Sequence, residues 1–522
     1  MLAMTIMESE PGSRFDKELA LAQRINSDPR LSFLPDLYEK LPQAEWYLVG
    51  GAVRDFLMSR GSIKDYDLVV RHVGLEEVTS VLESRGNIDL VGRNFGVLKF
   101  WPKLPEREAG PAEEPIDLAW PRTEKAGGSG GYRDFQVQAD PELPIERDLS
   151  RRDFTINAMA WDMKLQRVID PFGGREDIEG KLVRAVGDPA ERFQEDYSRV
   201  LRAIRLSCQL GFDIEAQTWE AIKRFVPKLD ELRPVGRPEE GKRERVVPYE
   251  TVAKELAKAF GADALRALEL LESSGAVFRI IPELAALPAC VQSPEQHSEG
   301  DVWTHTKLAI SKLSSPEFAA WFPGEKPNTE TILALLLHDV GKPGTAAKDG
   351  DRLTYYGHEE RGSHIARSVS DRLKLPSAAG AGIDTERLSW LVKNHLFPNV
   401  VRVDEVRLTT LARYFLADRA AGRSLLHIAF ADASASIPQG GQPDLSNLGR
   451  LMHVLYEMGK QTSPETGKPP RLLTGHEIMD LTGLAAGPEI GRIMELLAEK
   501  QLRGEVATVE QAKEFLRSLP AE

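Results

Sequence analysis

Cysteine is scarce in this sequence, with two among 522 residues. Cys208 and Cys290 stand far apart and match no metal-ligand spacing, which excludes a disulfide framework and a cysteine-rich zinc site and favours a reducing compartment. No apolar run approaches the ~20 residues that a membrane helix needs. The first residues lack the basic and apolar regions of a secretory signal. We therefore expect a cytoplasmic protein with no membrane partner.

An excess of positive charge is also missing. The formal net charge is −13, and the arginine-rich stretch 146–205 holds 12 Lys and Arg residues against 12 Asp and Glu. Composition therefore gives no support for a nucleic-acid partner, although a local basic face is enough to contact phosphates. With 42% hydrophobic and 28% charged residues, the chain has the balance of a globular protein. An RNA partner has to be argued from motifs.

The apolar pattern predicts an α+β protein of several modules, because 522 residues exceed one ordinary domain. The runs WYLV, LVGRNFGVLKFW and PIDLAW predict strands of a mixed sheet, and helical periodicity dominates after about residue 190. The glycine- and proline-rich segment 125–148 predicts a mobile loop. The expected modules are a helical leader at 1–45, a mixed-sheet domain at 46–170, and helical modules at 171–235, 236–300, 301–445 and 446–522.

The first motif with chemistry is a glycine turn followed by paired aspartates. Gly50 and Gly51 let the backbone approach a triphosphate closely, and Arg54 on the following helix can neutralise it. Asp65 and Asp67 lie two residues apart on a predicted strand, so both carboxylates face one side and can hold Mg²⁺. Such ions activate a 3′ hydroxyl and stabilise leaving pyrophosphate. Taken alone, each half of the motif is more typical of a solvated surface turn than of a site.

Two further elements extend this motif less specifically. Asp117, at the edge of the PIDLAW strand, offers a third catalytic carboxylate, with a structural role as an equal alternative. In RRDFTINAMAWD, residues 151–162, Arg152 and Asp153 precede apolar residues at helical spacing. We expect a helix there. Its charged start either caps the helix or, together with the glycine turn, contacts the nucleotide.

A third block, QEDYSRVLRAIR, repeats charged residues every three positions, at Asp196, Arg199, Arg202 and Arg205. On a helix this spacing forms one slowly turning face. A carboxylate beside a guanidinium supplies acceptors and donors that match a base edge, and further arginines suit phosphates. An ordinary ladder of ion pairs is the alternative, and for this block alone it is the favoured one.

Together, GGAVRD–DYD, RRDFTINAMAWD, DPFGGREDIEGKLVRAVGDP and EDYSRVLRAIR resemble, in order, the motifs of class II tRNA nucleotidyltransferases and bacterial poly(A) polymerases. The resemblance covers residues 46–215. It implies that Asp65 and Asp67 bind Mg²⁺, and that Asp196 and Arg199 hydrogen-bond the Watson–Crick edges of CTP and ATP in place of a template. It also implies nucleotide contacts by Gly51, Arg54, Arg152, Arg202 and Arg205.

The same resemblance implies a DNA polymerase β-like head, a helical neck with the nucleotide-selecting helix, an RNA-binding body and a tail. It implies addition of CTP, CTP and ATP to the 3′ end of tRNA by a monomer or weak dimer. An A-adding enzyme or a poly(A) polymerase uses the same blocks, so a narrower repertoire stays open. The loop at 125–148 is present. Its loss is associated with enzymes that stop after CC, so that alternative is disfavoured.

Histidine and aspartate recur on predicted helices of the second half, where imidazole and carboxylate can converge on a divalent metal. The residues are His305, His338, Asp339, His358, His395 and Asp432. Their order around HDVGKP resembles the HD superfamily of metal-dependent phosphohydrolases over about 300–440. It implies a second metal, for which imidazole ligands suit Ni²⁺, Mn²⁺ or Co²⁺. The alternatives are histidines that only brace helices, and an HD phosphohydrolase whose head merely binds RNA.

Overall fold

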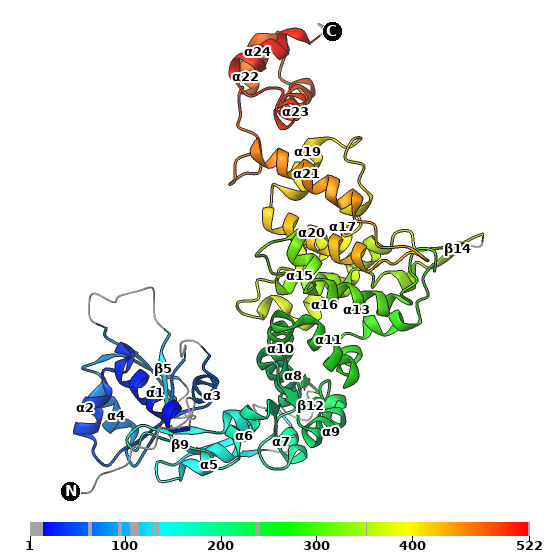
Figure 1. Cartoon of the computed structure of the whole chain (residues 1–522). Coiled ribbons are helices and arrows are strands. Elements are labelled where there is room, and N and C mark those ends of the chain that lie inside the picture. The colour runs from blue at the N-terminus through cyan, green and yellow to red at the C-terminus, as the bar shows by residue number, and fades with distance from the viewer. Residues whose placement is uncertain are drawn as a thin grey trace, which may run out of the picture. The chain divides into compact units, whose positions relative to one another are not determined.

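The computed structural model describes residues 14–60, 65–91, 97–104, 114–126, 130–131, 135–234, 241–350 and 352–519. The chain forms two compact units (Figure 1). Unit 1 comprises Met1–Thr251 and Ser274–Arg279, and unit 2 comprises Val252–Ser273 and Ile280–Glu522. Within the described ranges, no helix is long and apolar enough to cross a bilayer. The finer division into six modules stays a prediction.

Unit 1 is built on a seven-stranded mixed sheet with the strand order β3-β4-β5-β2-β1-β8-β9. Strands β2 and β5 pair in parallel, and the other neighbours pair antiparallel. The described residues of the predicted apolar runs lie in or directly beside strands of this sheet, which confirms the α+β class. Its strands are β1 (Glu45–Val49), β2 (Asp67–Arg71), β3 (Gly86–Val91), β4 (Val97–Pro102), β5 (Ile116–Ala119), β8 (Ala160–Asp162) and β9 (Arg167–Ile169).

The leader belongs to the core of this sheet domain. Its helices are α1 (Arg14–Ser27) and α2 (Leu34–Lys40), and α3 (Gly51–Leu57) and α4 (Leu75–Leu82) follow within the sheet region. Leu21 and Leu37 are fully buried in the same cluster as Leu48 and Leu68 of the central strands. Burying a leucine side chain contributes roughly 1.5–3 kcal/mol. Residues 14–40 therefore stabilise the head.

The predicted mobile loop at 125–148 is wrong for much of its length. Strands β6 (Arg122–Ala126) and β7 (Phe135–Ala139) form an antiparallel hairpin, and helix α5 (Ile145–Ser150) follows. The sequence FQVQA of β7 alternates apolar and polar residues, which is the strand period. The glycine-rich composition of this segment predicts a loop, and it outweighed the short strand pattern of β7. Residues 127–129 and 132–134 lie outside the described part of the chain.

The helix predicted for 151–162 is also wrong. One 3-10 turn, Thr155–Asn157, leads into strand β8, which pairs with β1 and β9. Residues 158–161 are all buried. A short apolar run enclosed on both faces fits a strand as well as a helix, so periodicity cannot separate the two. The sheet topology favours the strand, because β8 pairs with the side of β1 that β2 does not occupy.

The rest of the chain is largely helical. Unit 1 continues with α6 (Gly174–Glu179), α7 (Pro189–Glu195), α8 (Arg199–Leu210) and α9 (Ala216–Phe225). The long helices from the boundary onward are α10 (Tyr249–Ala262), α11 (Ala264–Ser273), α13 (Val302–Lys312), α15 (Thr329–Leu337), α16 (His358–Leu373), α17 (Thr385–Asn394), α19 (Leu408–Phe415), α20 (Arg419–Ala435), α21 (Ser446–Lys460), α22 (Gly475–Thr482), α23 (Pro488–Leu502) and α24 (Val509–Ser518). Short helices α12 (Ala276–Ile280), α14 (Pro316–Trp321) and α18 (Phe397–Val400) lie among them.

Candidate active site and metal centre

Three carboxylates gather at one edge of the head sheet. Strand β2 begins at Asp67, so Asp65 precedes the strand that was predicted to carry both. Burial still alternates here, because Asp65 and Asp67 are exposed and Tyr66 between them is buried. On the neighbouring parallel strand, Asp117 is the register partner of Asp67. The sheet therefore places the third candidate carboxylate beside the first two.

The electrostatics of this edge suit a cation. Desolvation raises the pKa of the Asp67 carboxyl, and the nearby charges of Asp117 and Asp65 raise it further, while Arg152 opposes them. Lys99 Nζ lies 3.1 Å from Asp117 Oδ1 and offsets part of the negative charge. A raised carboxyl pKa means that the ionised form is disfavoured as the protein stands. A divalent ion between these oxygens removes that penalty, so the residues fit magnesium.

The glycine turn closes the other side of this edge. Gly50, at the start of α3, has φ +77°, a value that L side chains rarely adopt. A Cβ added to Gly50 would lie 3.0 Å from Arg152 Nη1 and 3.8 Å from Asp67 Oδ2. The bare backbone therefore lets the Asp67 carboxylate and the Arg152 guanidinium share one small space. A side chain at position 50 would be strained by the positive φ and would crowd the guanidinium.

The arginines of the head are held in place by nearby acceptors. Arg54 donates to Asn157 Oδ1 at 2.6 Å and to Asp55 Oδ1 at 2.9 Å. Arg152 Nη2 lies 3.3 Å from Asp148 Oδ2, and its buried Nε has no hydrogen-bond partner within the described residues. A fixed guanidinium with a spare donor is ready for an anion. Arg54 and Arg152 therefore remain candidates for the triphosphate.

Asp153 acts as an anchor for Arg202. Its Oδ2 accepts hydrogen bonds from Arg202 Nε at 2.9 Å and from Nη2 at 2.5 Å, and its Oδ1 accepts from Asn157 Nδ2 at 3.2 Å. Burial alone raises the pKa of the Asp153 carboxyl, but the Arg202 charge outweighs it and holds the pKa far below its usual value. Asp153 is therefore ionised at neutral pH. Its contact is with an arginine of α8.

Asp196 and Arg199 do not share a helix, contrary to the predicted face of four charged residues. Asp196 has extended backbone at the end of α7, and α8 begins at Arg199. The Asp196 carboxylate accepts from the Ser198 amide at 2.9 Å. The chain turns between the two helices at this point. Arg202 and Arg205 do continue along α8, and Arg205 Nη1 donates to Gln209 Oε1 at 2.7 Å.

Arg199 is nearly buried and is fixed by three hydrogen bonds. Its Nη1 donates to Glu195 Oε2 at 2.7 Å and to the Arg192 carbonyl at 2.9 Å. Its Nη2 donates to the Arg151 carbonyl at 3.2 Å. A guanidinium has five N–H donors, so two remain beyond these bonds. Sequence reasoning missed Glu195, which sits one turn before Arg199 and precedes Asp196 directly.

In unit 2, the six predicted HD residues meet at one buried centre. His305 lies on α13, the His338–Asp339 pair follows α15, His358 begins α16, His395 ends α17, and Asp432 lies on α20. The four histidines and Asp339 are at most 6% exposed. Two groups of their ligand atoms lie within 4.8 Å of one another: His305 with His338 and Asp339, and Asp339 with His358 and His395.

Three of these imidazoles present unpaired nitrogens to Asp339. The Nδ1 atoms of His338, His358 and His395 each hydrogen-bond a backbone carbonyl three residues earlier, at 2.6–2.8 Å. An Nδ1–H donor leaves Nε2 as a lone pair. The three Nε2 atoms lie 3.2–3.9 Å from Asp339 oxygens, yet none has a hydrogen-bond partner among the described residues. Buried lone pairs that converge in this way fit a metal ion.

The histidines of this centre differ in their pKa values, and therefore in whether they carry a proton at neutral pH. Burial lowers the pKa of His395 to about 4, so this imidazole is neutral at pH 7. Burial also opposes the charge of His305, but its hydrogen bonds to Asp432 and Glu299 raise its pKa to about 9. A metal ion bound through His305 at neutral pH would have to displace the proton that this imidazole carries. Asp432 Oδ1, 3.1 Å from His305 Nε2, becomes available with it.

The sequence analysis did not predict Glu299, His297 and Lys342, which lie around this centre. Glu299 Oε1 lies 2.8 Å from His305 Nδ1 and 2.7 Å from His297 Nδ1. Lys342 Nζ lies 2.7 Å from Asp339 Oδ2 and 2.8 Å from Gln292 Oε1. The fourth position after His338 in HDVGK is this lysine, so its spacing was readable. Glu299 and His297 lie in a loop before α13, where no periodic pattern points inward.

The comparisons with known proteins agree with this division of the chain. Two family models match: the Poly A polymerase head domain over residues 46–184, and the HD domain over residues 310–427. An A-adding tRNA nucleotidyltransferase of Deinococcus radiodurans is 32% identical over 386 residues, 72% of this chain and 79% of that protein. A multifunctional CCA protein of Halorhodospira halophila is 38% identical over 338 residues, 64% and 70% of the two chains.

The fold is shared with solved enzymes over nearly the whole length. The CCA-adding enzyme of Bacillus stearothermophilus, solved in complex with CTP, covers 98% of this chain and of its own, at 21% identity and a TM-score of 0.55. At that identity the likeness shows the fold, and the relatives above 30% identity show the family. The chain therefore belongs to the tRNA nucleotidyltransferases, as a member that carries an HD domain behind its polymerase head.

Proposed function

We propose that this nucleotidyltransferase adds C, C and A in turn to the 3′ end of tRNA and releases pyrophosphate at each step. The observation that carries the proposal is the fixed Arg199 beside Asp196, a donor and an acceptor at the start of α8. Watson–Crick edges of C and A both offer an amino donor next to a ring-nitrogen acceptor. One carboxylate and one guanidinium therefore match both bases and reject U and G.

In this proposal the head residues divide the work by chemistry. Asp65, Asp67 and Asp117 hold Mg²⁺, which supplies charge stabilisation to the 3′ oxygen and the leaving pyrophosphate. Arg152 and Arg54 bind the triphosphate beside the Gly50–Gly51 turn. Asp153 orients Arg202 toward the same nucleotide. CTP, ATP and the tRNA 3′ end are thus the substrates.

The repertoire is tested with three RNA substrates: tRNA without its CCA end, tRNA ending in C, and tRNA ending in CC. Each is incubated with CTP or ATP alone and with both, and the products are sequenced. Full CCA addition extends all three to CCA. An A-adding enzyme, such as the Deinococcus radiodurans relative, extends only the third substrate. Long A tails on any RNA would instead indicate a poly(A) polymerase.

We also propose that the HD centre binds one or two transition-metal ions, with Ni²⁺, Mn²⁺ or Co²⁺ favoured by its imidazoles, and hydrolyses a phosphate ester. The three unpaired Nε2 atoms around Asp339 carry this second proposal. Elemental analysis of the protein purified without chelator tests the metal. Assays with phosphomonoesters and cyclic phosphodiesters test the reaction, with each metal added separately.

A further inference from the structure

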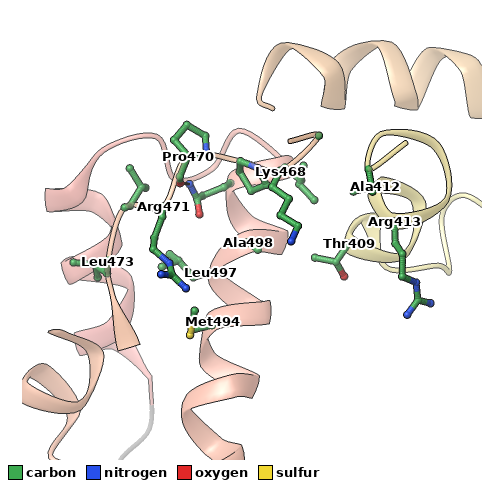
Figure 2. A pocket seen from close by; sticks show the side chains of 16 residues that line it. Thr409, Ala412, Arg413, Lys468, Pro470, Arg471, Leu473, Met494, Leu497 and Ala498 are labelled. Carbon is green, nitrogen blue, oxygen red and sulfur yellow. Dashed lines mark hydrogen bonds between the residues drawn. The ribbon is translucent and has the colours of Figure 1, made fainter. Parts of the chain in front are cut away.

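A cavity that shares no lining residue with either proposed centre lies in unit 2 between α19 and α23. Its volume is about 730 Å³, within the ~300–1,000 Å³ range of small-molecule sites. Its floor is apolar, formed by Leu473, Met494, Leu497 and Leu502 among others. Lys468 and Arg471 line its opening, whereas the guanidinium of Arg413 points away from them (Figure 2). None of the sixteen lining residues is acidic.

The cations of this cavity have no acidic residue beside them in its lining. The net charge of the chain is −13, so acidic residues outnumber basic ones overall. Lys468, Arg471 and Arg413 form no ion pair with any residue that the structure describes. Figure 2 shows Lys468 extending toward Thr409 across the opening, and Arg471 directed along Leu497. Lys468 and Arg471 are like charges at one opening without a counter-charge, and an anion beside them relieves their repulsion.

A neighbouring cleft on the same two helices supplies the contrast. It has a volume of about 480 Å³ and includes Arg407, Arg492 and Arg503. Each of these arginines has a carboxylate partner: Glu495 at 3.3 Å, Glu489 at 3.0 Å and Glu499 at 3.2 Å. Its cations are therefore neutralised by the protein itself. The first cavity needs its anion from outside.

The walls of the cavity are tied to each other, so it is more than a gap between helices. The Glu499 carboxylate of α23 accepts from the Leu408 and Thr409 amides at 3.0 and 3.1 Å and caps α19. Buried Gln501 of α23 donates to the Pro470 carbonyl at 2.7 Å, which holds the cationic segment. Gly467 has φ +61°, and an added Cβ would collide with the Leu416 carbonyl at the end of α19.

We propose that this cavity binds a small organic phosphate, with the phosphate on Lys468 and Arg471 and an apolar or planar body on the Leu497 floor. The flat surfaces of Pro469, Pro470 and Met494 suit a ring. A nucleoside monophosphate has both parts and fits the volume. Ligand binding here links the end of the HD domain to the tail, because α19 and α23 form opposite walls.

The test uses the full-length protein and AMP, with Mg²⁺ removed by chelator so that the head binds nucleotide weakly. Equilibrium dialysis measures AMP, adenosine and inorganic phosphate. Adenosine lacks the charge and phosphate lacks the ring, so each should bind at least about tenfold more weakly than AMP, the loss of one charge-assisted contact or more. Equal binding of AMP and adenosine would overturn the proposal.

Two exposed pairs of cations provide the matched variants. Lys468→Gln/Arg471→Gln should weaken AMP binding at least tenfold, and Arg407→Gln/Arg492→Gln in the neighbouring cleft should not change it. All four side chains are exposed, so both variants should keep the wild-type melting temperature.

Photolabelling with 8-azido-AMP should mark peptides from 467–473 or 494–502. Labels confined to unit 1, or unchanged AMP affinity in the first variant, would refute the site. Loss of tRNA affinity with AMP affinity intact would assign the cations to RNA instead.

Discussion

The head and the HD centre differ in how they place their candidate metal ligands. In the head, Asp65 and Asp67 are exposed carboxylates at a sheet edge, and no three acidic or imidazole groups among the described head residues converge within 4.8 Å. In the HD centre, the imidazoles are buried and their lone pairs already converge. The first arrangement needs substrate phosphates to complete the coordination of a metal. The second is preorganised to hold a metal in the protein alone.

The largest expected effect is the loss of nucleotide addition when a carboxylate of the head is changed. Asp67→Asn should reduce nucleotide addition by at least 100-fold, because the carboxylate that anchors the metal is lost, and losing one such electrostatic contact costs ~10²–10³ in rate. The measurement is single-turnover extension of tRNA with CTP. Binding of tRNA, measured by gel shift, should be unchanged, since phosphate contacts come from basic groups. Activity above a tenth of wild type would contradict the assignment of Asp67.

The next largest effect is a metal-induced rise in melting temperature that should depend on the HD centre and not on the head. A bound metal at about 100 times its Kd adds roughly 2.7 kcal/mol to the native state, a shift of several degrees in melting temperature. Added Ni²⁺, Mn²⁺ or Co²⁺ should therefore raise the melting temperature of the wild type and leave His338→Ala/Asp339→Ala unchanged. Asp67→Asn should respond as the wild type does. The double variant should keep nearly full CCA addition.

No metal-induced shift in the wild type, together with no hydrolysis, would mean that the histidines brace helices. The buried lone pairs around Asp339 would then have to be satisfied by water. Glu299→Gln gives a finer control, because it loosens His305 without removing any of the six predicted ligands. A smaller shift with the same metal preference is expected there.

The Asp153–Arg202 pair makes a third prediction, through pH. The native pKa of Asp153 lies below its unfolded value, so the pair stabilises the protein above pH ~4 and loses this contribution as pH falls through the native pKa. Asp153→Asn should lower the free energy of unfolding at pH 7 by about 1–3 kcal/mol. The difference from wild type should shrink as pH falls from 5 toward 2 in urea titrations. A pH-independent difference would place the loss in packing rather than charge.

Much of the head was readable from the sequence because its signals are local. The strands around WYLV and PIDLAW follow from short apolar runs, and the glycine turn and aspartate pair follow from their spacing. The pairing of Asp67 with Asp117 was not readable, since a parallel register depends on contacts across the sheet. The same is true of Arg199, whose partners include a carbonyl 48 residues earlier. In the HD centre, the order of the motifs predicted six residues that the structure brings together, but Glu299 in an irregular loop carried no pattern.

The smallest effect concerns the choice of base. Arg199 is held by three protein acceptors, so a flexible cation at this position keeps the charge and loses the fixed fork of donors. Arg199→Lys should reduce the preference for CTP and ATP over UTP and GTP by about tenfold, the cost of roughly one base-edge hydrogen bond. Its KM for CTP should rise less than the selectivity falls. Arg205→Gln, further along α8 and expected from the sequence motif to contact phosphates, should instead raise the KM of every nucleotide and keep the selectivity. The ratio of kcat/KM for CTP and UTP, measured for both variants, distinguishes base reading from phosphate binding. If Arg199→Lys behaves like Arg205→Gln, then Arg199 binds the triphosphate, and the choice between C, A and the other bases lies with Asp196 and its neighbours.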